Sequence, residues 1–146
     1  MYKFMVQFTR SDGNPGARTE RILRTTLDKV LTLEGFPKHT VWVVWISNKE
    51  STEVNYQMKK KRTPGDVFSF PRAEREMLGE ILIAPQYGRT MARKIGCDVN
   101  DLLLRWGVHG LFHLLGYDHE TPDDYSHMIQ KERRVISSVG REWIDL

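Results

Sequence analysis

Apolar residues along the chain follow two different periods, which predict helices and strands in turn. In residues 19–33 they recur three and four positions apart, as on one face of an amphipathic helix, with Arg18, Arg21 and Arg24 facing outward. Residues 40–46, TVWVVWI, are instead apolar at successive positions and are β-branched or aromatic. That run predicts a strand that is buried on both faces in the middle of a sheet.

Further strands are predicted at residues 1–8, 66–71 and 77–84, where short apolar runs are bounded by turn residues. Residues 49–61 carry no clear period and are interpreted as a short helix or as irregular chain. Together with residues 40–46, these segments predict a mixed sheet of about four strands.

Helices follow the last predicted strand. One is expected at residues 85–95, with proline in its first turn, and one through residues 102–115. Asp98 or Asn100 can cap the second of these helices, and Gly116 can end it.

The final helix is predicted to begin at a Thr121 cap that is followed by proline and two acidic residues. Its expected buried face consists of Tyr125, Met128, Ile129, Val135, Ile136 and Val139. The fold class is therefore α+β, with helices packed on the mixed sheet, and residues 1–146 are expected to form one domain.

Composition limits the partners and the cellular location that we expect for the protein. The 146 residues carry a net charge of +3, which permits an anionic partner without requiring one. The one cysteine, Cys97, cannot form a disulfide within the chain, and neither a cleavable signal nor a long apolar run is recognised. We therefore expect a cytoplasmic protein that does not bind membranes. The densest basic run is KKKR, residues 59–62.

Three of the five histidines lie within residues 109–119, HGLFHLLGYDH. His109 and His113 are four apart and share one helix face, and Gly116 allows the sharp turn that brings His119 back toward them. Three imidazoles with an open fourth position are typical of a catalytic zinc site, although nickel, copper or iron would also accept nitrogen ligands. The other two histidines have no such arrangement and are interpreted as ordinary surface residues: His39 and His127.

The spacing of these histidines is that of the metzincin protease motif, in which a glutamate general base follows the first histidine. Gly110 stands in that position here. Glycine cannot accept a proton through a side chain, which counts against peptide hydrolysis.

The stretch HGLFHLLGYDH also resembles the signature H-G-x-x-H-L-x-G-Y-D-H of the YbeY family, at all of its fixed positions. LGEILI, residues 78–83, resembles the family's L-G-D-I-x-I, with Glu80 in place of aspartate. VNYQMKKKRTPGDVFSFP, residues 54–71, resembles L-N-x-x-Y-R-x-K-D-x-P-T-D-V-L-S-F-P. The matching residues of that stretch are Asn55, Lys61, Pro64, Asp66, Val67, Ser69, Phe70 and Pro71.

The resemblance implies a metal-dependent endoribonuclease that cuts single-stranded RNA in maturation of the 16S ribosomal RNA 3′ end and in ribosome quality control. Its implied partners are ribosomal RNA and the 30S subunit with its proteins. It implies Zn²⁺ on His109, His113 and His119, with His113 also catalytic. The family's catalytic arginine falls on Lys59, which keeps the charge but loses the planar fork.

The remaining site residues are expectations about substrate binding. Lys60 and Arg62 are expected to share the RNA contact with Lys59, and Glu80 to line the substrate groove. Asp118 and Glu80 are candidate general bases, whereas Asp66 is interpreted as a turn cap. Two alternatives stay open at this point: a ribosome-associated binding factor whose metal is structural, and a zinc peptidase or other zinc hydrolase.

Overall fold

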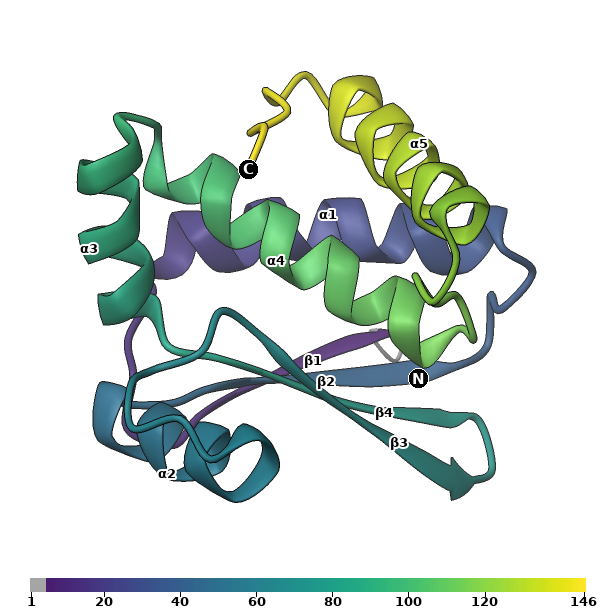
Figure 1. The fold of residues 1–146 in the computed structure, drawn as a ribbon. Coiled ribbons are helices and arrows are strands. Elements are labelled where there is room, and N and C mark those ends of the chain that lie inside the picture. Colours follow the sequence, from purple (N-terminus) through teal and green to yellow (C-terminus); the bar gives the residue numbers. More distant parts are fainter. Residues whose placement is uncertain (1–4) are drawn as a thin grey trace.

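A four-stranded sheet lies beneath two long helices in the computed structural model, which describes residues 5–146 (Figure 1). Its strands are β1 (Val6–Arg10), β2 (Thr40–Trp45), β3 (Phe68–Glu74) and β4 (Met77–Ile83), in the spatial order β1-β2-β4-β3. β1, β2 and β4 are parallel, and β3 pairs antiparallel with β4. The prediction of an α+β fold with a mixed sheet is confirmed. Residues 1–4 of the first predicted strand lie outside the described part of the chain.

The helices follow the predicted order closely. They are α1 (Ala17–Leu33), α2 (Asn48–Lys59), α3 (Pro85–Ile95), α4 (Val99–Leu114) and α5 (Pro122–Ser138). Of the two alternatives for residues 49–61, the helix is the one that forms. Asp98 caps α4, and Thr121 caps α5 by accepting a hydrogen bond from the Asp124 amide. Within residues 5–146, none of these helices has the length and hydrophobicity needed to cross a membrane.

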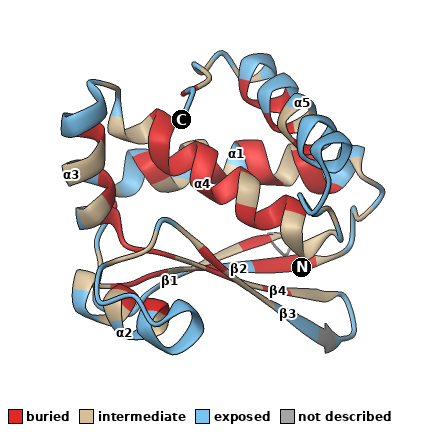
Figure 2. Cartoon of the chain, viewed as in Figure 1, coloured by how far each residue is buried: buried red, intermediate tan, exposed pale blue. Residues whose placement is uncertain are grey.

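β2 is central in the sheet, as predicted, but only one of its faces is fully buried. Val41, Val43 and Trp45 are completely buried on the side covered by α1 and α4, whereas Trp42 on the opposite side is 36% exposed. In Figure 2 the helices above the sheet are rich in buried residues, while the other face is covered only at one end, by α2. The expectation of burial on both faces is therefore wrong. A continuous apolar run does not reveal that a β-branched or aromatic side chain also tolerates a half-exposed sheet face.

α4 is the helix around which the other elements pack. It contacts α1, α3, α5, β3 and β4, and almost all of its residues from Asp101 to Phe112 are buried. At Gly110 the helix comes especially close to the sheet. A Cβ atom built there would lie 2.9 Å from Ile81 Cγ2 and 3.0 Å from Ser69 Oγ, and that hydroxyl donates a hydrogen bond to the Gly110 carbonyl. Glycine thus sets the distance between α4 and the sheet.

Three predictions about side-chain exposure need correction. Tyr125 is 49% exposed instead of buried, because it lies in the first turn of α5, in a stretch from residue 121 to residue 127 that is exposed throughout. Arg24 does not face fully outward, since its guanidinium lies over the Phe8 ring, 5.0 Å from the centroid. His39 is partly buried and meets the Phe36 ring edge-on at 5.0 Å between centroids.

We predict that Ser47→Ala lowers the free energy of unfolding by about 1 kcal/mol. Ser47 Oγ accepts a hydrogen bond from the Glu50 amide at 3.0 Å, and the Glu50 carboxylate accepts one from the Ser47 amide at 3.1 Å. The substitution removes the first of these contacts at the start of α2. Urea unfolding measures the loss, with the exposed helical Ser137→Ala as control. Equal stability of the two variants would contradict the role of this cap.

Candidate metal centre

The three histidines of residues 109–119 converge, as predicted. His109 and His113 lie one turn apart on α4, and Gly116 adopts a left-handed conformation with φ 96°. The Gly116 amide donates to the His113 carbonyl, and the Tyr117 amide donates to the Phe112 carbonyl, which ends the helix in a tight turn. His119 returns from this turn, so that one ring nitrogen from each histidine lies within 4.8 Å of the others.

Hydrogen bonds determine which ring nitrogens can bind a metal. His113 Nδ1 lies 3.1 Å from the Tyr117 carbonyl, and His109 Nδ1 lies 3.2 and 3.3 Å from the two carboxylate oxygens of Glu132. Carbonyl and carboxylate oxygens only accept, so both Nδ1 atoms carry the hydrogen, and in the neutral rings both Nε2 atoms then carry lone pairs. The two Nε2 atoms lie 3.0 Å apart.

Two lone pairs at this separation repel each other unless a proton or a metal ion lies between them. Two nitrogen ligands of a tetrahedral zinc ion are separated by roughly 3.3 Å, so the spacing fits such an ion. Burial, together with the nearby His109 and His119, lowers the pKa of His113 and keeps its ring neutral at neutral pH. The neutral imidazole is the form that binds a metal. The donor set of this cluster therefore fits a divalent transition metal.

Glu132 is a residue of this centre that the sequence analysis missed. Its side chain is 0% exposed and lies on the inner face of α5, among apolar residues. A carboxylate that orients a histidine ligand fixes the ring and increases its basicity. The available signal was the position of Glu132, four residues after Met128 and four before Ile136, on a face that is otherwise apolar.

The histidines lie in a cleft of about 550 Å³. α4 forms one wall of this cleft, and the end of α2 with the segment leading into β3 forms the opposite wall. Lys59 lines the same cleft, so the structure brings this predicted residue together with the histidines. Two charged groups in the lining were not predicted to belong to the site: Asp66 and Arg105.

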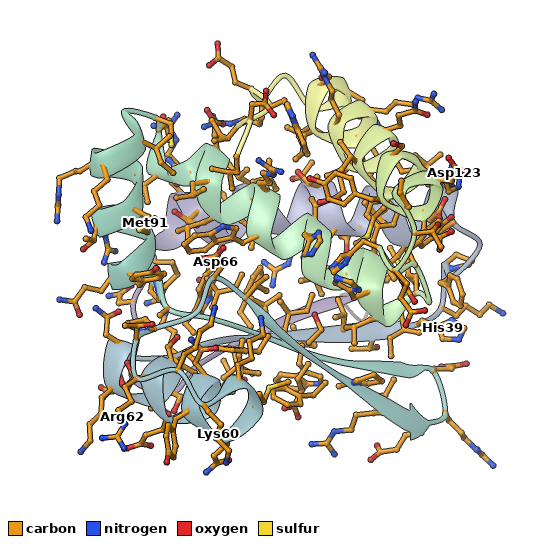
Figure 3. The ribbon with its side chains drawn as sticks, in the orientation of Figure 1. His39, Lys60, Arg62, Asp66, Met91 and Asp123 are labelled. Carbon is orange, nitrogen blue, oxygen red and sulfur yellow. The ribbon has the colours of Figure 1, made fainter. Side chains whose placement is uncertain are left out.

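The other predicted substrate residues lie elsewhere. Lys60 Nζ and the Arg62 guanidinium lie 5.2 and 5.3 Å from the centre of the Tyr56 ring, and neither lines the cleft. In Figure 3 both residues lie at the far side of α2, away from Asp66 and α4. Glu80 alternates with the buried residues of β4, so it faces the side of the sheet opposite α4, where it binds Arg72 at 2.6 Å.

Asp66 lies on the loop that faces α4 across the cleft (Figure 3). The surrounding walls remove part of its hydration and so raise the pKa of its carboxyl, while the charges of Lys59, His109 and Arg105 act in the opposite direction. Asp66 is therefore a carboxyl group with an increased affinity for protons beside the histidines.

Gly110 shows why the centre lacks a protease-type base. The protease motif requires a glutamate here, yet even a Cβ atom would crowd Ile81 and Ser69. This position on α4 points into the sheet, so a carboxylate cannot be accommodated there without moving the helix.

Comparisons with known proteins find relatives that match most of this chain. The sequence profile of a family described as endoribonuclease YbeY matches residues 6–140. An endoribonuclease YbeY of Thermotoga maritima is 33% identical over 129 residues, which are 88% of this chain and 85% of the relative. An endoribonuclease YbeY of Bartonella quintana is 34% identical over 125 residues, 81% of this chain and 78% of the relative.

The fold also resembles the solution structure of a Thermotoga maritima protein. The TM-score is 0.66 at 26% sequence identity, and the match covers 93% of this chain and 92% of that chain.

We predict that Glu132→Gln weakens zinc binding by roughly 10- to 100-fold. The amide keeps the volume of the side chain but removes the negative charge beside His109. Titration against a chromophoric zinc chelator measures the affinity. Glu142→Gln removes an exposed carboxylate outside the cleft and serves as control. An unchanged zinc affinity in the Glu132 variant would show that the carboxylate does not support the ligand.

We predict that Asp66→Asn raises the melting temperature at pH 7. Because the folded-state pKa of Asp66 is raised, folding disfavours its ionised form. This penalty appears as the pH rises above the unfolded-state pKa and is complete above the folded-state pKa. Well below the unfolded-state pKa of about 3.9 the carboxyl is protonated in both states, so parent and variant should converge there. Thermal unfolding across this range tests the sign, with the exposed Asp12→Asn as control. A variant that is less stable at pH 7 would contradict the assignment.

Proposed function

The chain belongs to the YbeY family of endoribonucleases, which are RNA-hydrolysing enzymes, and from this premise we propose that it cuts single-stranded ribosomal RNA in the three-histidine cleft. The observation that carries the proposal is the presence of three converging imidazoles, a lysine and a protonatable carboxyl in one cleft. We place this activity in processing of the 16S ribosomal RNA 3′ end and in ribosome quality control. The partners would be the 30S subunit and its proteins, and the location would be the cytoplasm.

His109, His113 and His119 would hold the metal, which we propose to be Zn²⁺. When bound, such an ion supplies a Lewis acid for a phosphoryl oxygen and lowers the pKa of a bound water to about 7. The chain's own contribution starts with Glu132, which holds the His109 ring in the required orientation. The Tyr117 carbonyl does the same for His113.

Lys59 would stabilise negative charge on the phosphoryl group as it reacts. It lines the cleft with the histidines and carries its charge on a flexible stem. A preorganised cation at the position where charge develops lowers the barrier. Lysine acts there as a point charge, without the two-pronged hydrogen bonding of arginine.

Asp66 is the carboxyl group that we assign to proton transfer, because it lines the cleft and its pKa is raised. A raised pKa suits a group that accepts a proton near neutral pH. Glu80 faces the other side of the sheet and has no part in this scheme. The Asp118 carboxylate accepts a hydrogen bond from the Glu120 amide at 2.7 Å and so stabilises the turn that contains His119.

Lys60 and Arg62 would contact the RNA backbone outside the cleft, where their charges attract phosphates without reading sequence. They lie on the same helix end as Lys59, so a strand leaving the cleft over α2 would pass them. Peptide hydrolysis is disfavoured by the packing at Gly110.

The test is cleavage of a labelled fragment of the 16S ribosomal RNA 3′ end by zinc-loaded protein. We predict at least a 100-fold loss of cleavage in His113→Ala and parent-like cleavage in His127→Ala. His127 is an exposed histidine outside the cluster, so this control removes an imidazole that is not one of the three; its ring lies 5.9 Å from the Tyr117 ring, between centroids.

Equal cleavage by all three proteins would assign the activity to a contaminant. Absence of cleavage in the parent, together with retained 30S binding, would favour the ribosome-associated binding factor. Cleavage of a peptide substrate that disappears in His113→Ala would favour the peptidase.

A further inference from the structure

Arg105 is a buried cation in the wall of the cleft. It lies on α4 one turn before His109, and a turn of helix is about 5.4 Å, so both side chains leave the same face of the helix. Arg105 is only 8% exposed, yet it lines the cleft together with Lys59 and the histidines. Burying a guanidinium is costly unless a group of opposite charge pairs with it.

The guanidinium is only partly satisfied by the chain. Within residues 5–146 its one hydrogen bond runs from Nη1 to the Ile144 carbonyl, and the group stacks on the Trp143 ring at 4.1 Å. Nε and Nη2 make no hydrogen bond there, and neither atom is sealed from solvent. Burial lowers the pKa of Arg105, while Glu132, Tyr125, Asp145 and Asp66 act in the opposite direction through their charge, without a hydrogen bond to the guanidinium. The cleft therefore contains free N–H donors with a positive charge.

We propose that Arg105 binds a backbone phosphate of the RNA, next to the phosphate that reacts at the histidines. The inference rests on the proposed function and names a residue that binds the substrate. A planar guanidinium matches phosphate oxygens through parallel N–H donors, whereas Lys59 on the facing wall provides only a point charge. One turn of α4 separates the anchoring group from the metal centre, so two successive phosphates of one strand could occupy the two positions.

The competing interpretation is structural, because Arg105 also holds residues 143–144 against α4. Arg141 offers a matched control. It pairs with Asp101 at 2.7 Å and Asp98 at 3.5 Å, so it fastens the same C-terminal segment to the start of α4, but it does not line the cleft. Loss of either arginine removes one positive charge and one attachment of this segment.

The experiment measures binding of a fluorescent 2′-O-methyl RNA strand to zinc-loaded protein by anisotropy at several salt concentrations, and kcat/KM on the unmodified strand. We predict that Arg105→Gln binds roughly tenfold more weakly, with a log–log salt dependence shallower by about 0.7. Arg105→Lys should bind more weakly than the parent but keep the parent's salt dependence, because the charge is retained. Arg141→Gln should match the parent in both.

Each outcome separates this inference from the proposed function. Equal binding and salt dependence of Arg105→Gln and the parent, with cleavage intact in the parent, would overturn the phosphate contact alone. The same loss of RNA binding in Arg141→Gln would show that the effect comes from the C-terminal segment. That result would also overturn the proposed phosphate contact. The predicted binding loss without any cleavage by the parent would support the contact but refute the endoribonuclease site. No binding by the parent at low salt would refute both.

Discussion

The close approach of α4 to the sheet at Gly110 is the constraint on which the rest of the site depends. Because no side chain stands between the helix and Ile81, the helix lies low on β3 and β4, and the Ser69 hydroxyl fixes the depth through the Gly110 carbonyl. The neighbouring residues on either side of this contact are thereby placed in the cleft wall. His109 and His113 can face α2 and its loop only because the helix cannot rise or rotate at this point.

The second constraint comes from the opposite side of α4. α5 covers the helix and contributes Glu132, a buried carboxylate whose hydrogen-bonding partner is His109. A buried carboxylate without a partner would be costly, so the contact serves both residues: it satisfies the charge and it orients the ring. The centre is thus held by packing against the sheet below and by a polar contact from the helix above.

Much of this arrangement could be predicted from local signals. Helical periodicity and the Thr121 cap predicted the elements, and the spacing within residues 109–119 predicted the three-histidine cluster, since each depends on residues close in sequence. The roles of Glu132, Asp66 and Arg105 could not be predicted, because each depends on which segments meet in space. A glutamate on a helix, or an arginine four residues before a histidine, indicates no role in a site until the element packed against it is known. Trp42 and Tyr125 were misjudged for the same reason, since burial is decided by the neighbouring element.

The residues of the cleft differ greatly in how far apart they lie along the chain. The three clustered histidines fall within eleven residues, whereas Glu132 lies 23 residues after His109 and Lys59 lies 50 residues before it. Closing a short loop costs little conformational entropy, and contacts between distant segments form late in folding. The histidine cluster is therefore complete once α4 and its turn have formed, while the wall that carries Lys59 needs the whole sheet. A partly folded chain would already bring the three imidazoles together, but it would lack the opposite wall of the cleft.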